Sequence, residues 1–501
     1  MAGSNLLPTI HPRTQFMNDA PPATAQSSTL GDAIPASGTP NRGFRGDQKP
    51  RKGDWLGLIL AWVLILIGIV LWAWEPAEPS ADGPGAEIPS GLLLTAQDEM
   101  VGKLALGLRS FGVAATLPPM QQAEPLATGS VAQRLAYAIL AAEILGIEQA
   151  RDELESILSE SGEDPVTRLL LPAVESVFDA AEAGEAAPVS SIELLEDRLG
   201  WFGRLADAIG RPEAIAKVES ESESGVLALL TLVGLMLVFG LLGFVGLIVL
   251  LSLGLTGKIA SKVIPISRHG IYAETFAIWL LLMLLIQIVM SELAPAGFGM
   301  IASTVGFFLS LLVLGWPVLR GMEWEAVRKD IGLERPRLLD VPAGVASWAM
   351  ALPFLAVGAI ITFVLMIVVQ VLTNETPQPS HPAQQAAVNA GTWDLFQIFL
   401  LATIAAPVVE EIMFRGVLLS HLRGAMKRWA APVAIALAAT VSSVIFAAIH
   451  PQGLIFIPPL AGLGIGFCIA REWRGSLIPA MVAHGFSNAL VMTLNVVLFS
   501  S

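Results

Sequence analysis

The 501 residues of this chain are 54% hydrophobic and only 14% charged, and the formal net charge is −14. An ordinary soluble domain carries roughly 25% charged residues, so the composition indicates a protein embedded in a lipid bilayer. The acidic balance argues against nucleic acid as a partner, because binding to phosphates depends on Lys and Arg. One cysteine, Cys468, cannot by itself build a disulfide framework or a thiolate metal site.

The N-terminal part divides into a polar tail and an apolar run. Residues 1–54 are rich in Pro, Ser, Thr, Ala and Gly and end in a basic cluster, which predicts a disordered basic cytoplasmic tail. Residues 55–74 carry no charge and have the ~20-residue length that crosses a ~30 Å hydrocarbon core. They predict transmembrane helix 1, because a cleaved signal peptide has a shorter apolar region.

Residues 75–223 are acidic, and stretches such as 134–160 repeat apolar residues at helical spacing between charged ones. Several prolines punctuate the first part of this region and indicate a linker. We therefore predict an acidic helical domain with a Pro-rich linker.

Eight further apolar runs follow from Gly225 onward. They span residues 225–255, 273–291, 299–318, 345–372, 394–421, 432–449, 454–470 and 476–499. The predicted fold class is therefore an all-α integral membrane protein, with about nine transmembrane helices and a helical exoplasmic insert. Residues 225–372 would hold helices 2–5, and residues 390–499 would hold helices 6–9. The loop between these two groups contains a glycosylation string at Asn374.

The positive charges alternate from one connector to the next. Lys and Arg occur after the runs 225–255, 299–318, 394–421 and 454–470, whereas the intervening connectors carry none. Because basic loops stay on the cytoplasmic side, the N-terminus is predicted to be cytoplasmic, and residues 75–223 are predicted to be exoplasmic. The expected location is the plasma (inner) membrane.

Ionisable residues cluster in the last four runs, where burying a charge costs roughly 2.5 to 3.5 kcal/mol and usually marks function. Glu411 and Arg415 are spaced i, i+4 with the acid first, which favours an ion pair. Glu410 points about 100° away on the same helix. The pair would neutralise Glu411, and Glu410 would face a cavity.

Two further motifs lie on the seventh and ninth runs. Phe446 precedes His450 by four residues, so that the aromatic ring would pack on the imidazole and orient it. His484 and Asn488 share one helical face and can both donate hydrogen bonds to one oxygen. The expected structural support for this site comes from Glu411, Arg415 and Phe446.

These side chains allow two hydrolytic chemistries. A carboxylate held out of water is a stronger base, so Glu410 and His450 could activate a water molecule while His484 and Asn488 stabilise an oxyanion. Alternatively, Glu410, His450 and His484 could bind Zn as a His2Glu site of a metalloprotease. A third interpretation is non-catalytic: the polar groups would join helices in a membrane immunity or scaffold protein.

Together the three strings resemble the motifs of the CPBP family of CAAX-protease and bacteriocin-processing (Abi) membrane proteins, which includes the Rce1-type prenyl endopeptidases. The family pattern Glu-Glu-x-x-x-Arg, Phe-x-x-x-His and His-x-x-x-Asn is matched at 410–415, 446–450 and 484–488 without substitution. The resemblance covers roughly residues 390–499.

The resemblance implies a helical membrane core and an endopeptidase, either zinc-dependent or glutamate-dependent. It implies Glu410 as the water-activating residue, His450 as its partner, and His484 with Asn488 as the oxyanion site. The implied substrate is a membrane-associated or prenylated (CAAX-type) protein or peptide in the lipid bilayer.

Two details of helix packing complete the sequence pattern. Gly462 and Gly466 form a small-x-x-x-small pair, which predicts a close approach of two helices. His450 lies near the far end of its run, whereas Glu410 and His484 lie about midway along theirs. The seventh run must therefore start after Pro432, or be tilted or broken near Pro451.

Overall fold

The structure is a computed structural model that describes residues 54–73, 92–111, 118–373 and 391–499. All of the predicted tail at 1–54 except its last residue, most of the Pro-rich linker and the glycosylation string at Asn374 lie outside the described residues. In the described ranges all regular elements are helical and no strand occurs. The prediction of an all-α integral membrane protein is confirmed.

Among the described residues, eight helices or runs of joined helices are long and apolar enough to cross a membrane. They are α1 (Asp54–Ala73), α10 (Pro212–Leu255), α11 (Gly270–Leu293), α12 to α13 (Gly299–Leu319), α15 (Asp340–Thr373), α17 to α19 (Thr392–Ala425), α20 (Ala431–Ala448) and η5 with α21 (Leu454–Arg474). A ninth apolar helix is α22 (Ile478–Phe499). These helices match the nine predicted runs in order. Each run is helical because, in lipid, the backbone N–H and C=O groups must bond to one another.

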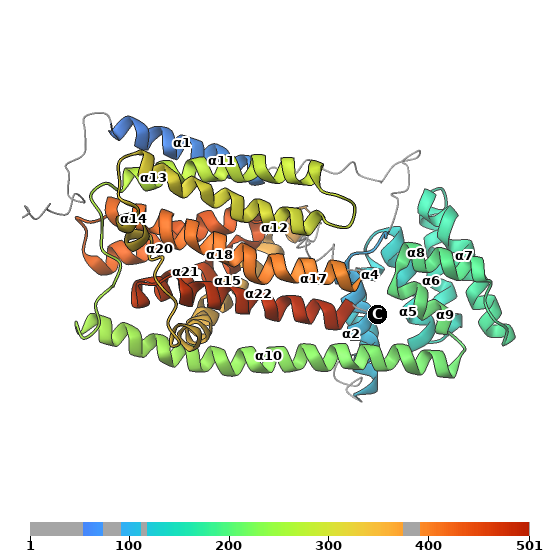
Figure 1. The fold of residues 1–501 in the computed structure, drawn as a ribbon. Coiled ribbons are helices and arrows are strands. Elements are labelled where there is room, and N and C mark those ends of the chain that lie inside the picture. Colours follow the sequence, from blue (N-terminus) through green and yellow to red (C-terminus); the bar gives the residue numbers. More distant parts are fainter. Residues whose placement is uncertain (1–53, 74–91, 112–117, 374–390, 500–501) are drawn as a thin grey trace, which may run out of the picture. The chain divides into compact units, whose positions relative to one another are not determined.

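Residues 92–111 and 118–211 form short helices around a core of their own. The helices are α2 (Ala96–Ser110), α3 (Pro119–Gln122), α4 (Glu124–Ala127), α5 (Val131–Ile144), α6 (Ile147–Ser161), α7 (Pro165–Ala183), α8 (Val189–Leu199) and α9 (Trp201–Ala208). Their amphipathic faces bury Leu135, Ile139, Phe178 and Phe202 completely. Helix α10 then runs unbroken from Pro212 to Leu255, so the boundary predicted near residue 224 falls inside one helix (Figure 1).

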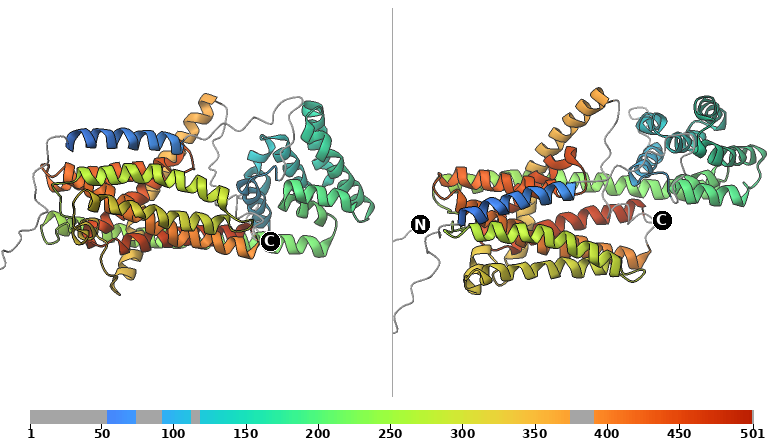
Figure 2. Two further views of the ribbon diagram at one scale, coloured as in Figure 1. Left: turned by 45° about the horizontal axis from the view of Figure 1, so that its top comes forward. Right: turned by 90° about the horizontal axis from the view of Figure 1, so that it is seen from above.

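Helix α1 packs along α11, and the views of Figures 1 and 2 agree on this placement. Gly68 makes the approach close, because a Cβ atom added there would lie 3.3 Å from the Leu280 side chain. The indole of Trp72, near the end of α1, donates a long hydrogen bond of 3.5 Å to the Leu280 carbonyl. The first membrane helix is thereby attached to the bundle that contains the C-terminal motifs.

Helices α15 and α21 pack backbone against backbone, as the glycine pair predicts. A Cβ atom at Gly462 would collide with the carbonyl of Phe354, and one at Gly466 would collide with Ala351. In lipid, such close packing supplies the dispersion contacts that hold helices together.

The depth of His450 has a simple structural cause. Helix α20 begins at Ala431, with Pro432 in its first turn, and ends at Ala448. His450 lies in the turn that follows, because Pro451 lacks an N–H group and disfavours helical geometry in the preceding residue. The break near Pro451 is therefore the correct one of the two expectations.

Candidate active site

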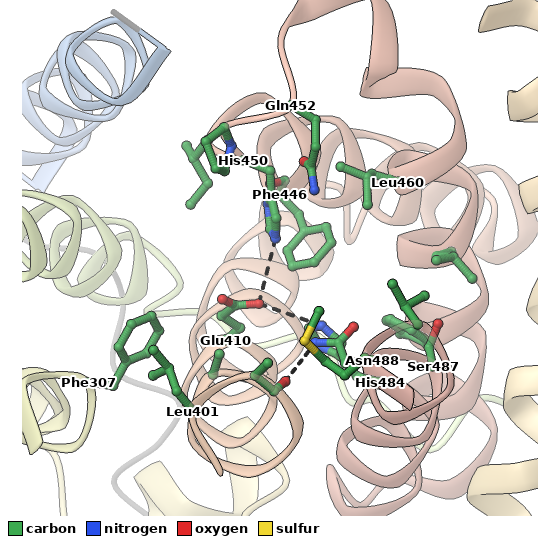
Figure 3. A pocket seen from close by; sticks show the side chains of 18 of the residues that line it. Phe307, Leu401, Glu410, Phe446, His450, Gln452, Leu460, His484, Ser487 and Asn488 are labelled. Atoms are coloured by element: carbon green, nitrogen blue, oxygen red, sulfur yellow. Dashed lines mark hydrogen bonds and ion pairs between the residues drawn. The ribbon is translucent and has the colours of Figure 1, made fainter. Parts of the chain in front are cut away.

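The three motifs line one cavity of about 390 Å³ (Figure 3). Its polar lining comes from Glu410, His450, Gln452, His484, Ser487 and Asn488. The rest of the wall is apolar and includes Trp72, Trp279, Met283, Phe307, Leu401, Leu460 and Phe467. Helices far apart in the sequence, from α1 to α22, thus enclose a few polar groups in a hydrophobic chamber, which is the usual composition of a ligand site.

The two adjacent glutamates diverge as predicted. Glu411 Oε1 lies 2.7 Å from Arg415 Nη1, and both side chains are completely buried. Glu410 points instead into the cavity. Its Oε2 atom is buried and has no hydrogen-bond partner among the described residues. A buried acceptor of this kind is available to a bound molecule.

Both imidazoles turn Nε2 toward Glu410. His450 Nδ1 lies 2.7 Å from the Phe446 carbonyl, which can only accept, so Nδ1 carries a proton. His450 Nε2 then lies 4.0 Å from Glu410 Oε2, and His484 Nε2 lies 3.7 Å from the same oxygen. One carboxylate oxygen is therefore shared by two imidazoles at distances slightly longer than a direct hydrogen bond.

Glu411 has a second contact that the sequence pattern does not predict. Its Oε1 atom, already paired with Arg415, accepts a hydrogen bond of 2.9 Å from His484 Nδ1. Helix spacing within one segment cannot reveal this bond, because Glu411 and His484 are 73 residues apart. The pair predicted to neutralise Glu411 thus also fixes the orientation of His484.

Phe446 takes the supporting position that its spacing predicts. Its ring centroid lies 4.4 Å from that of His450 and 5.6 Å from that of His484. The Arg415 guanidinium carbon lies 4.4 Å from the same ring and 5.2 Å from the ring of Phe467. These cation–π contacts stabilise a buried guanidinium that has lost its hydration.

Asn488 bonds to a helix whose backbone is irregular beside Glu410. The segment Leu401–Ala405 is a π-helix, in which the Ala406 N–H bonds to the Leu401 carbonyl. The next donor in that pattern would be residue 407, but Pro407 has no N–H. Asn488 Nδ2 donates instead to the Ala402 carbonyl at 2.8 Å. The asparagine thereby satisfies a carbonyl that the proline leaves without its backbone donor.

A zinc site needs a group of side chains that can hold the ion together. Zinc binds carboxylate and imidazole atoms at about 2.0 to 2.2 Å. Hydrogen bonding at both Nδ1 atoms resembles the outer shell of metal sites. However, the described residues contain no group of three or more His, Cys, Asp or Glu side chains placed to hold a metal ion. We therefore derive no step through a metal.

All seven predicted site and support residues therefore lie at or around one cavity. The sequence pattern does not point to Gln452, which lines the cavity from the turn after His450. A glutamine between Pro451 and Gly453 is typical of an exposed loop, and only the tertiary fold turns it inward. The aromatic residues that α1 and α11 contribute to the cavity wall could not be predicted from the sequence for the same reason.

Comparison with known proteins agrees with the motifs. Residues 392–490 match the family model described as type II CAAX prenyl endopeptidase Rce1-like. The membrane-embedded CAAX protease MroQ of Staphylococcus aureus (strain USA300) is 29% identical over 144 residues, which cover 28% of this chain and 57% of that relative. No solved structure gives a significant match. The predicted resemblance to the CPBP family is confirmed.

Proposed function

We propose that this protein, whose residues 392–490 form an Rce1-like domain of the CPBP family of intramembrane proteases, is an endopeptidase that hydrolyses a peptide bond inside the bilayer. The observation that carries the proposal is the position of Glu410. Its Oε2 atom has no hydrogen-bond partner among the described residues and lies 3.7 and 4.0 Å from the Nε2 atoms of two histidines that line the same cavity. A base, its partner and an oxyanion donor are thus close enough to act on one water molecule.

In the proposed reaction, Glu410 removes a proton from a water molecule that also donates a hydrogen bond to His450 Nε2. The water oxygen adds to the scissile carbonyl carbon, and the carbonyl oxygen becomes an oxyanion. When this intermediate collapses, the C–N bond breaks and the proton held by Glu410 passes to the leaving amine. The products are a carboxylic acid and an amine.

His484 can stabilise the oxyanion only if its Nε2 atom carries a proton. Because Nδ1 already donates to ionised Glu411, the ring must then be an imidazolium. Two carboxylates, the Arg415 guanidinium and one imidazolium sum to zero charge, which is the favourable state in a buried site. Asn488 has a second amide hydrogen beyond the one bonded to Ala402, and this hydrogen would complete the oxyanion site.

The proposed substrate is a membrane-associated protein or peptide, with a prenylated CAAX-type protein as the family-based candidate. The proposed location is the plasma (inner) membrane, with the N-terminus cytoplasmic and residues 75–223 exoplasmic.

The decisive experiment uses purified full-length protein and quenched fluorescent peptides in liposomes. We expect Glu410→Ala and His450→Ala to reduce kcat/KM by about 10² to 10⁴, the usual contribution of an acid–base group. Glu292→Gln, an exposed acid at the end of α11, is the matched control and should cleave like wild type. Cleavage by both active-site variants at the wild-type rate would refute this active site, whereas a wild-type protein that cleaves none of the peptides would favour the non-catalytic scaffold.

The zinc alternative predicts a different response to metal removal. Chelation should abolish cleavage and added Zn should restore it, with metal content near one per protein molecule. The glutamate route predicts cleavage that is unchanged by chelator. Elemental analysis beside the activity measurement distinguishes the two.

A further inference from the structure

Gln452 is a polar residue of the cavity wall that belongs to none of the three motifs. Its side-chain oxygen has no hydrogen-bond partner among the described residues. Gln452 follows His450 and Pro451 in the turn between α20 and η5 (Leu454–Phe456). Gly453, with φ of +81°, lets the backbone reverse direction directly after it. The turn therefore directs the Gln452 carboxamide inward, beside His450 and Leu460 (Figure 3).

The amide oxygen of Gln452 is buried and has no hydrogen-bond partner among the described residues. An unpaired buried acceptor costs about 1 to 3 kcal/mol, and folded proteins rarely retain one without a reason. Since the Gln452 side chain lines the cavity together with Glu410 and His450, the natural partner of this oxygen is a donor on the molecule that enters.

A peptide about to be cleaved in a membrane supplies such a donor. Hydrolysis requires the scissile segment to leave its helix, and this exposes backbone N–H and carbonyl groups that lipid cannot satisfy. A carboxamide can accept from a backbone N–H and also donate to a backbone carbonyl. Among the cavity-lining side chains, Gln452 combines this chemistry with an acceptor that has no partner among the described residues.

We propose that Gln452 binds the backbone of the unwound substrate, with its Oε1 atom accepting a hydrogen bond from a peptide N–H near the scissile bond. This inference rests on the proposed endopeptidase function and adds a substrate-binding residue to it.

The test combines a near-isosteric variant, Gln452→Met, with a series of substrates, each of which lacks one backbone N–H group. The probe is a peptide that wild type cleaves and Glu410→Ala does not. A series of analogues replaces each amide within three residues of the scissile bond by an ester. Because the hydrogen bond exists in both ground and transition states, Gln452→Met should raise KM about tenfold and leave kcat nearly unchanged.

The ester series identifies the bonded N–H. At one position the ester should lower wild-type kcat/KM about tenfold and should have no further effect in Gln452→Met, since the acceptor is already gone. If every ester penalty is the same in both proteins, or if Gln452→Met has the wild-type KM, the amide is satisfied by water and the inference is wrong. These outcomes leave the endopeptidase itself untouched, because that depends on the Glu410 comparison.

Discussion

At the scale of single residues, Glu411 is the group on which the site's geometry depends. It accepts from Arg415 within its own helix and from His484 on α22, and its carboxylate is completely buried. The first contact follows from the i, i+4 spacing, so the sequence predicts it. The second joins two helices and becomes visible only when the bundle is assembled.

Replacing Glu411 by Gln should therefore affect stability and catalysis together. The variant leaves the Arg415 charge buried without its counterion, which costs about 3 to 5 kcal/mol. It also removes the carboxylate that stabilises an imidazolium at His484, so kcat should fall. Thermal unfolding in detergent micelles and kcat on the fluorescent peptide measure the two effects.

The matched control is Glu325→Gln, which breaks the exposed i, i+4 pair with Lys329. Exposed pairs contribute little, so the melting temperature should not change. Equal melting temperatures for Glu411→Gln and Glu325→Gln would contradict the importance assigned to the buried pair.

At the scale of elements, helix limits were largely predictable whereas helix irregularities were not. The hydrocarbon thickness sets the minimum length of a spanning helix, and the predicted runs 273–291 and 432–449 agree with α11 and α20 within a few residues. The π-helical turns beside Glu410 depend on Pro407 together with a donor from α22, Asn488. Pro407 can be read from the sequence, whereas the contact with Asn488 becomes visible only in the tertiary structure.

The relation between Pro407 and Asn488 can be measured as a double-mutant cycle. Asn488→Ala should lower stability by about 1 kcal/mol, because the Ala402 carbonyl then has no donor. In a Pro407→Ala background the backbone regains an N–H, and this stability cost should disappear. The kcat defect that remains in the double variant reports the oxyanion role alone. Additive stability effects would contradict the link between the two residues.

The glycine contact between α15 and α21 gives a separate prediction. Gly462→Ala places a methyl group against the Phe354 carbonyl, so the helices must separate and the melting temperature should fall. Gly234→Ala in α10 is the control, because nothing lies within 4 Å of the added atom. If both variants have the melting temperature of the wild type, the contact contributes nothing to stability.

At the scale of the whole molecule, the distribution of Lys and Arg predicts which loops face the cytoplasm. The only cysteine, Cys468, is completely buried, so single cysteines can be introduced against a silent background. Ser159→Cys, in α6, should react with a membrane-impermeant maleimide in intact cells. Leu338→Cys, 96% exposed in the loop before α15, should react only after permeabilisation. The reverse labelling pattern would show that the topology is opposite to the predicted one.

Helix α10 is longer than a membrane is thick. Its 44 residues span about 66 Å, whereas the lipid interior is ~30 Å thick, so roughly half of the rod stands clear of lipid. Where it crosses α15, a methyl group at Gly243 would collide with the backbone of Ala349, which leaves no slack at that point. Helix α15 in turn packs against α21 and α22, so α10 is joined through direct contacts to the helices of the candidate site.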